Sequence, residues 1–144
     1  MAKVSTYLNF KNQTEEAFRY YAKVFGTELG HLSRFKDIPA GPDSPPIPPG
    51  VGDLVMHADV AILAGHVLMG TDAPEAMGFQ VVQGNNVYIM LEPDTREQTL
   101  ALFTALSEGG KVEQPLQDTF WGAYYGSAKD KFGVQWMFNC MAKG

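Results

Sequence analysis

The segment from Val4 to Gly26, VSTYLNFKNQTEEAFRYYAKVFG, has the pattern of a strand followed by a helix. Its first seven residues alternate in character, which is the period of a half-buried strand. Asn12, with Glu15 three residues later, predicts a helix N-cap, and the apolar spacing that follows predicts a helix with one buried face. Gly26 predicts the end of this helix, because glycine adopts the left-handed conformation without steric penalty.

The same pattern returns in the second half of the chain. Alternation over Val87–Glu92 predicts another strand, and Asp94 predicts another N-cap. Asp94 lies 82 residues after Asn12, and Gly109 lies 83 residues after Gly26. The second helix is expected to bury an apolar stripe of Leu100, Phe103 and Leu106. A repeat this regular predicts two similar modules.

Three short strands are expected after each helix. The first set falls at Leu29–Phe35, Leu54–Leu63 and His66–Asp72, and the second at Val112–Thr119, Trp121–Ala128 and Val134–Asn139. Each module therefore reads strand, helix and three strands (βαβββ). The sequence predicts one domain made of two such modules, at about 1–80 and 81–144.

The first module is longer because of a proline-rich segment, Asp37–Gly52, which holds six of the nine prolines. Proline lacks the N–H group that a β-ladder requires, so we predict a loop over residues 37–52. Two interpretations of this loop remain open. It is either a surface insertion or a semi-rigid lid over a site.

The composition narrows the function before any motif is considered. A chain of 144 residues is long enough for a real core, and its net charge of −5 disfavours nucleic acid as a partner. Cys140 is the one cysteine, which excludes an internal disulfide and a multi-cysteine zinc site. No apolar run is long enough to cross a membrane and no secretory leader opens the chain, so we expect a cytoplasmic protein without a membrane partner.

Several pieces of the sequence, taken in order, resemble one family. They are Tyr7–Phe10 (YLNF), Glu15–Gly26 (EEAFRYYAKVFG), Met56–Asp59 (MHAD), Leu68–Asp72 (LMGTD) and Asp130–Met137 (DKFGVQWM). In these pieces and in its doubled βαβββ pattern, the chain is similar to the PhnB-like branch of the vicinal oxygen chelate (VOC) superfamily, also labelled 3-demethylubiquinone methyltransferase-like. This superfamily includes glyoxalase I, bleomycin-resistance proteins and extradiol dioxygenases. The resemblance implies an α+β fold in which paired βαβββ modules form curled sheets around a cavity, commonly in a homodimer.

In metal-dependent members of the superfamily, inward-facing His and Glu side chains hold a divalent ion. Carried over by strand register, the four positions fall on Ser5, Gly70, Tyr88 and Met137. A hydroxyl, a bare backbone, a phenol and a thioether suit such an ion poorly, and a slip of one or two residues brings no histidine there. We therefore expect neither the usual metal site nor a cofactor, and a divalent metal on non-standard ligands is the disfavoured alternative. The methyltransferase label is not supported either, because the sequence has no glycine-rich turn between a strand and a helix.

The strand expected at Leu54–Leu63 carries the candidate catalytic pair. Alternation places Val55, His57 and Asp59 on one face and a more apolar set, which includes Met56, on the other. If the apolar set faces the core, His57 and Asp59 look into the cavity, where the carboxylate could orient the imidazole for general acid–base catalysis. The alternatives are a structural histidine or a pair that faces solvent.

Aromatic and polar side chains on the expected inward faces predict a pocket for a flat organic ligand. The candidate ligand-binding residues are Ser5, Tyr7, Asn9, Asp72, Tyr88, Trp121, Tyr125 and Met137. Asp72, near a strand end, is also a candidate for a turn or a cap.

The leading functional hypothesis is a small-molecule-binding protein that sequesters its ligand without the usual metal site. The negative net charge favours a neutral or cationic ligand. The alternative is an enzyme of the glyoxalase or dioxygenase type, with His57 as acid/base or a divalent metal on non-standard ligands. The expected partners are a small molecule and a second copy of the chain.

Overall fold

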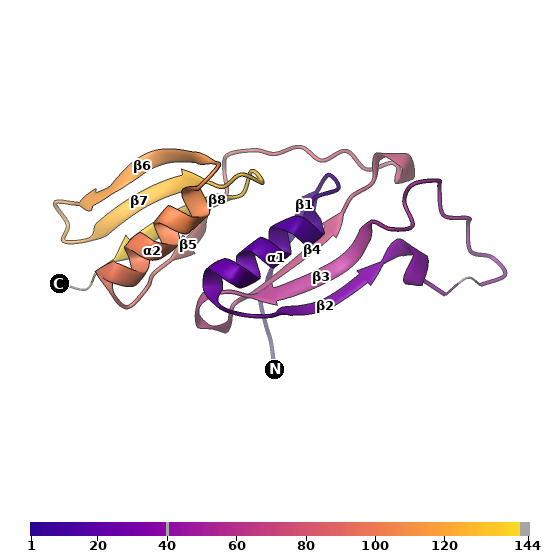
Figure 1. The fold of residues 1–144 in the computed structure, drawn as a ribbon, viewed down its shortest axis with the longest axis horizontal. Helices are drawn as coiled ribbons and strands as arrows, with labels where there is room; N and C mark the ends of the chain where they lie inside the picture. The colour runs from indigo at the N-terminus through magenta and orange to yellow at the C-terminus, as the bar shows by residue number, and fades with distance from the viewer. Residues whose placement is uncertain (40, 142–144) are drawn as a thin grey trace. The chain divides into compact units, whose positions relative to one another are not determined.

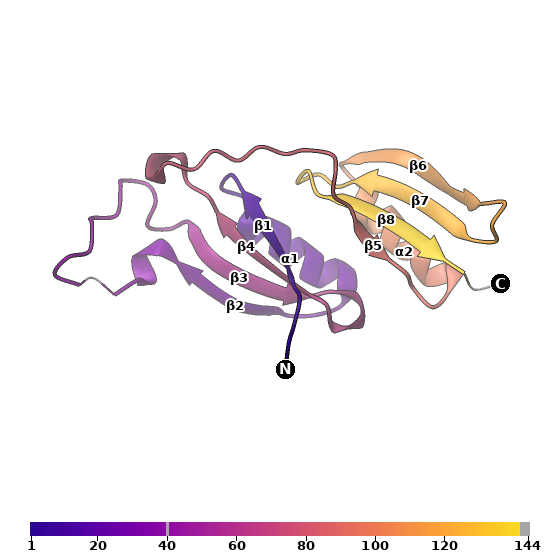
Figure 2. The same cartoon turned by 180° about the vertical axis from the view of Figure 1, so that it is seen from behind.

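Each half of the chain forms a four-stranded sheet with one helix packed on it (Figures 1 and 2). The computed structural model describes residues 1–39 and 41–141, so Ala40 of the predicted loop 37–52 lies outside the described residues. The chain divides into two compact units, Met1–Val82 and Gln83–Gly144. Each unit holds one module.

The first module orders its strands β1-β4-β3-β2. Its elements are β1 (Thr6–Phe10), α1 (Thr14–Phe25), β2 (Leu29–Arg34), β3 (Val55–Ala61) and β4 (Val67–Asp72). β1 runs parallel to β4, and the other neighbouring strands are antiparallel. Short 3-10 helices follow three of the strands: η1 (Phe35–Asp37), η2 (Leu63–Gly65) and η3 (Glu75–Met77).

The second module repeats this order as β5-β8-β7-β6. Its elements are β5 (Ile89–Leu91), α2 (Arg96–Ser107), β6 (Lys111–Asp118), β7 (Tyr124–Lys129) and β8 (Gln135–Cys140). β5 is parallel to β8, and the other pairs are antiparallel. The predicted α+β fold of paired βαβββ modules is confirmed.

Aromatic side chains of α1 pack on the inner face of the first sheet. Phe18 and Tyr21 are fully buried, and the ring of Phe18 meets that of Phe10 edge-on, with 6.3 Å between centroids. Gly70 of β4 lies under Phe18, because a Cβ at this position would come within 2.7 Å of the phenyl ring. The missing side chain therefore lets the helix pack closely against the sheet.

The first turn of α1 is capped by a residue distant in sequence. The N-cap position is Gln13, which makes no side-chain cap bond, and Asn12 has a φ of 62°. The predicted cap at Asn12 is therefore wrong. Instead, Asp72 Oδ1 accepts hydrogen bonds from the Thr14 N–H (3.0 Å) and hydroxyl (2.7 Å), and its Oδ2 accepts one from the Val55 N–H (2.9 Å). This buried carboxylate ties α1 to β3 and β4.

The second helix is capped locally, one residue later than predicted. The hydroxyl of Thr95, rather than Asp94, accepts a hydrogen bond from the Gln98 N–H at 3.0 Å. Thr95 has the extended backbone that an N-cap residue needs, with φ −129° and ψ 154°. The N-cap is of the expected kind, a side-chain oxygen that accepts a backbone hydrogen bond, and only its predicted position in the sequence was wrong.

The helix ends agree with the sequence, whereas one position of the apolar stripe does not. Gly26 takes the left-handed conformation after α1 (φ 67°), and Gly109 does so after α2 (φ 76°). Phe103 is buried as predicted, but Leu100 is 50% exposed and Leu102 is buried. The stripe of α2 is therefore rotated relative to the predicted one.

A β-bulge in β3 changes which side chains face the helix. Ser33 pairs with His57 and Arg34 pairs with Val55, so that Met56 is an extra residue in β3. Val55 is 1% exposed and belongs to the core, whereas Met56 lines a cavity. The predicted faces of Val55 and Met56 are therefore wrong.

The turn between β7 and β8 is built around the buried Asp130. Its Oδ1 accepts hydrogen bonds from the N–H groups of Phe132 (2.9 Å) and Val134 (3.0 Å), and its Oδ2 accepts one from the Trp136 indole (2.9 Å). Gly133 completes the turn with a φ of 90°, which glycine adopts readily. The DKFGVQW piece of the sequence is thus a structural unit.

Candidate functional site

Three aromatic side chains form a row across the outer face of the first sheet, away from α1. The ring centroids of Tyr7 (β1) and His57 (β3) are 5.9 Å apart, and those of His57 and His31 (β2) are also 5.9 Å apart. Tyr7 is 51% exposed, and the side chain of His57 is 28% exposed. The row is therefore open to a small molecule from solvent.

Asp59 is held beside this row by the backbone of β2. Its Oδ1 accepts a hydrogen bond from the His31 N–H at 3.0 Å, and its Oδ2 lies 3.9 Å from Nε2 of His57. Gly30 makes room for this arrangement, because a Cβ there would overlap the Asp59 carboxylate. A separation of 3.9 Å is too long for a hydrogen bond but forms an ion pair whenever His57 carries a proton.

A cavity of about 370 Å³ adjoins the row. Its lining residues come from β1, β3, β4 and the segments after β2 and β4: Tyr7, Asn9, Phe35, Met56, Thr71, Asp72, Ala73, Met77 and Phe79. Most of this lining is apolar, and Tyr7 and Asn9 contribute exposed polar side chains. Because Tyr7 belongs to both features, the row and the cavity together make one candidate site, which we call the sheet-face site.

Asp72 is among the residues that line the cavity, but both of its carboxylate oxygens are already bonded. Thr14 occupies one oxygen with two hydrogen bonds, and Val55 occupies the other. Asp72 is 3% exposed, and this burial fits the turn or cap role for which the sequence also made it a candidate. A further role for Asp72 in ligand binding stays a prediction. Ser5 lies just before β1 and is not part of the cavity lining.

The remaining candidate ligand-binding residues lie in the second module. The register of β7 and β8 puts Tyr125 and Met137 on the same face, and the ring of Trp121 lies 6.0 Å from that of Tyr125. Trp121 precedes β7, so its predicted place within a strand is wrong. Tyr88 donates a hydrogen bond of 2.9 Å to Glu113, which raises the pKa of the phenol. A binding role for these side chains stays a prediction.

The positions at which the superfamily holds a metal do not fit a divalent ion. Gly70 offers no side chain and packs under Phe18, Tyr88 is bonded to Glu113, and Met137 offers only a thioether. Within residues 1–39 and 41–141, no three His, Cys, Asp or Glu side chains are arranged to hold a metal ion.

Neither turn from a strand into a helix fits S-adenosylmethionine, which the methyltransferase label implies. Residues 11–13 (KNQ) join β1 to α1 and residues 92–95 (EPDT) join β5 to α2, and neither turn contains glycine. Such glycines let a ligand approach the free N–H groups of the helix. At α1 that place is taken by the carboxylate of Asp72, which bonds the Thr14 N–H.

Sequence reasoning missed most walls of the cavity. The predicted strand ends at Phe35, and alternation assigns Met56 to the core because it takes no account of a bulge. Met77 is the last residue of η3 and Phe79 follows it, in a part of the chain after β4 where no periodicity of the sequence marks a face. The one available signal was the presence of large apolar side chains in a segment with no predicted strand or helix, where Met77 is 44% and Phe79 is 52% exposed.

Comparison with known proteins agrees with the resemblance seen in the sequence. A family model described as 3-demethylubiquinone-9 3-methyltransferase matches residues 2–138. The chain belongs to this family. Among characterised sequences, Protein YjdN of Escherichia coli (strain K12) is 30% identical over 141 residues, which cover 94% of this chain and 93% of YjdN.

Solved structures carry the same fold. Protein PA1353 from Pseudomonas aeruginosa is 34% identical, with a TM-score of 0.83 over 97% of this chain and 98% of that one. A PhnB protein from Bacillus cereus, called a putative 3-demethylubiquinone-9 3-methyltransferase, is 24% identical, with a TM-score of 0.77 over 96% and 99%. A glyoxalase-related enzyme from Fulvimarina pelagi is 15% identical, with a TM-score of 0.53 over 97% and 88%, and shares the fold alone.

The structure bears on one part of the membrane prediction, the absence of a helix that could cross a bilayer. Within the described part of the chain, no helix combines the length and the apolar character that crossing a bilayer requires.

Proposed function

We propose that this protein binds a small, largely apolar organic molecule in the sheet-face site and sequesters it. The single observation that carries the proposal is the cavity of about 370 Å³. Pockets for small organic ligands are typically concave, mostly apolar and supplied with a few polar groups that set orientation. This cavity has that composition.

The lining suggests how such a ligand would be held. Phe35 and Phe79 contribute aromatic surface that suits a flat molecule, and the methionines adapt to its outline because their side chains are unbranched and flexible. Tyr7 and Asn9 supply a hydroxyl and an amide at the open sheet face. The net charge of −5 favours a neutral or cationic ligand over an anion.

Two fluorescent probes that differ by one charge test this proposal. N-Phenyl-1-naphthylamine is neutral, and 1-anilino-8-naphthalenesulfonate adds a sulfonate to the same ring system. We expect the neutral probe to bind more tightly, and Phe79→Ala to weaken its binding by about tenfold, which corresponds to roughly 1.4 kcal/mol.

Phe120→Ala is the matched control, because Phe120 is a 98% exposed phenylalanine outside the cavity lining. Its affinity for the neutral probe should stay that of the unmodified protein. Equal binding by the Phe79 and Phe120 variants, or tighter binding of the sulfonate probe, would contradict the proposal.

A second candidate function is acid–base catalysis at the same site. The observation that favours it is the arrangement of His57, with Tyr7 on one side and the oriented carboxylate of Asp59 on the other. An imidazole beside a carboxylate is a common general base for removing a proton next to a carbonyl group.

Deuterium exchange into 2-hydroxyacetophenone, an apolar hydroxyketone, tests this second function. A general base at His57 should catalyse exchange of the protons next to the ketone, and His57→Gln should abolish it. His66→Gln is the control, because His66 bonds Thr6 at the start of β1 and is not part of the row. No protein-catalysed exchange, or equal exchange by the His57 variant, contradicts a catalytic role.

We also infer that two copies of the chain associate. The inference is supported by the family resemblance and by exposed apolar side chains in the second module, among them Val87 (68%) and Met90 (47%). Light scattering on the purified protein tests it, and a monomer at micromolar concentration would contradict it.

A further inference from the structure

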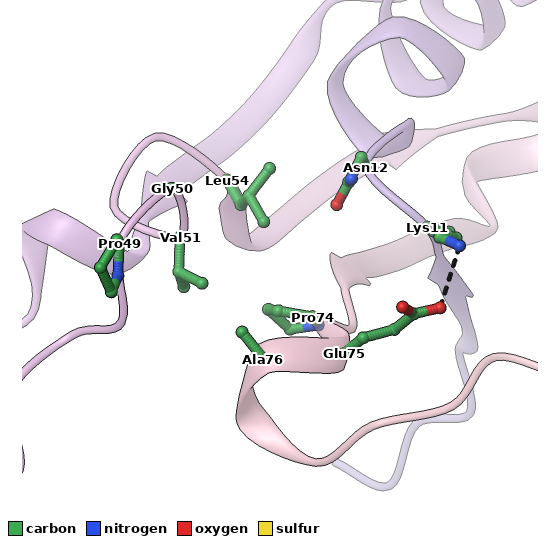
Figure 3. A pocket seen from close by; sticks show the side chains of 9 residues that line it. All are labelled: Lys11, Asn12, Pro49, Gly50, Val51, Leu54, Pro74, Glu75 and Ala76. Atoms are coloured by element: carbon green, nitrogen blue, oxygen red, sulfur yellow. Dashed lines mark ion pairs between the residues drawn. The ribbon is translucent and has the colours of Figure 1, made fainter.

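A second pocket lies in the first module, and η3 contributes residues both to it and to the sheet-face site. It has a volume of about 190 Å³ and is formed where the turn between β1 and α1, the end of the proline-rich loop and the start of η3 meet (Figure 3). Pro74 and Glu75 face this pocket, whereas Ala73 and Met77 line the cavity of the sheet-face site. We call it the loop pocket.

The loop pocket carries one charge of each sign. Lys11 Nζ and Glu75 Oε1 form an ion pair of 2.9 Å, and their side chains are 65% and 64% exposed (Figure 3). An exposed pair of this kind contributes little to stability, because both charges stay largely in water. A ligand that brings both a carboxylate and an ammonium group can therefore separate the two side chains at little cost and pair with each.

The opposite wall of the pocket is apolar and pre-formed. Val51 is 2% exposed, and its N–H donates to the carbonyl of Pro48 at 3.1 Å. The N–H of Leu54 donates to the carbonyl of Val51 at 3.0 Å, and that of Lys36 donates to Gly52 at 3.0 Å. The end of the proline-rich loop is thus fixed to the module, so this wall need not be ordered when a ligand binds.

Asn12 adds a neutral polar group to the same pocket. Its backbone is in the left-handed region (φ 62°), a conformation that asparagine tolerates better than most residues. Its side chain lines the pocket and is exposed (Figure 3). The amide is therefore available as a donor and an acceptor for a bound molecule.

We infer that the loop pocket binds a small zwitterion with an apolar side chain, in the class of a free aliphatic amino acid. The carboxylate would pair with Lys11, the ammonium group with Glu75, and the side chain would lie against Val51 and Leu54. The inference is independent of the proposed function, because it uses none of the residues that line the sheet-face site.

Calorimetry with L-leucine and two analogues tests the charge requirement. 3-Methylbutan-1-amine lacks the carboxylate, and 4-methylpentanoate lacks the ammonium group, while both keep the aliphatic chain. We expect leucine to bind and each analogue to bind at least about tenfold more weakly. Absence of leucine binding at about 10 mM, or an analogue affinity within tenfold of that of leucine, overturns the inference.

Two substitutions test the assigned residues, with the unmodified protein as reference. Lys11→Gln and Glu75→Gln should each weaken leucine binding by at least about fivefold, because each removes one charge partner. Lys36→Gln is the matched control: Lys36 forms a similar exposed pair with Asp53, at 2.8 Å, outside the pocket lining. A smaller effect of either pocket substitution, or an equal effect of Lys36→Gln, overturns the assignment.

Discussion

The two modules share one plan but use their buried aspartates differently. Asp72 and Asp130 are each 3% exposed, and each accepts at least three hydrogen bonds. Asp72 joins the start of α1 to β3, across sequence separations of 58 and 17 residues. Asp130 bonds groups two, four and six residues ahead of it, all within one hairpin.

This difference separates the parts of the sequence that specify the fold from those that can carry chemistry. In the DKFGVQW piece, which carried much of the family resemblance, the Asp130 carboxylate accepts hydrogen bonds from other residues of the same piece. In the first module Asp72 lies at the end of β4, and its carboxylate bonds α1 and β3. The outer face of the sheet stays open, and Tyr7, His57 and the cavity lie there. The first module is therefore where we place function.

The largest effect is expected from removing the two carboxylates. Asp72→Ala leaves three buried donors without a partner, and each such donor costs about 1–3 kcal/mol, so we expect a loss of roughly 4 kcal/mol in unfolding free energy. Asp130→Ala should cost less, about 3 kcal/mol, because its bond to Val134 is only partly buried. Urea unfolding followed by circular dichroism measures both.

Hydrogen exchange sharpens the same comparison and uses the milder Asn variants, which keep the shape of the side chain. Asp72→Asn should lower the protection of the amides of Thr14 and Val55, on two different elements. Asp130→Asn should lower protection at Phe132 and Val134 alone. If Asp72→Asn affected only one element, the long-range role of Asp72 would be wrong.

An intermediate effect is expected where each helix meets the last strand of its module. Phe18 packs on Gly70, the fourth residue of β4, whereas Phe103 packs on Phe138, the fourth residue of β8, with 5.2 Å between ring centroids. Gly70→Ala would push a Cβ into the ring of Phe18, at a cost of about 1–3 kcal/mol.

The second-site variant Phe18→Leu makes this prediction specific. A smaller side chain at position 18 should recover part of the stability lost in Gly70→Ala, which thermal unfolding of the single and double variants measures. Gly84→Ala is the control, because a Cβ there meets its nearest neighbour only at 3.5 Å. Additive losses from Gly70→Ala and Phe18→Leu would show that the two positions do not compete for space.

The smallest effect is a difference in acid sensitivity. Hydrogen bonds from Arg19 and then Arg34 lower the pKa of Glu15 in the first module, and two hydrogen bonds from Arg96 lower the pKa of Asp118 in the second. A carboxyl whose pKa is lowered by folding stabilises the protein above its ordinary pKa, and this contribution is lost as the pH falls through the folded value.

Glu15→Gln should therefore cost less than about 1 kcal/mol at pH 7, with the difference from the unmodified protein shrinking as the pH falls below about 4. Asp118→Asn should show a weaker dependence, because the side chain of Asp118 is 74% exposed whereas that of Glu15 is 33% exposed. Urea unfolding over a pH series checks both. A Glu15→Gln difference that is equal at pH 3 and pH 7 would contradict the assignment.

The sequence was informative wherever its patterns were local and periodic. Alternation and helical spacing gave both modules, and Gly26 and Gly109 marked the helix ends, because these signals arise from neighbours in the chain. The cap of α1 was out of reach, because Asp72 lies 58 residues away from Thr14. No propensity rule connects two such positions.

The candidate site was predicted in part for the same reason. Alternation placed His57 and Asp59 on the outer face, where the structure has them, but the bulge after Val55 moved Met56 to that face as well. A bulge depends on the partner strand and leaves no mark in the alternation itself. The walls formed by the segment after β4 depend on how an irregular chain folds back, which local patterns do not encode.

The separation between Thr14 and Asp72 also bears on the order of folding. The turn around Asp130 closes loops of two to six residues, whereas the cap of α1 closes one of 58 residues, and the entropy lost on closure grows with loop length. During synthesis α1 emerges first, yet its N-terminus has no cap until β4 has been made. The half of the protein that is translated last therefore holds the contacts that can form soonest.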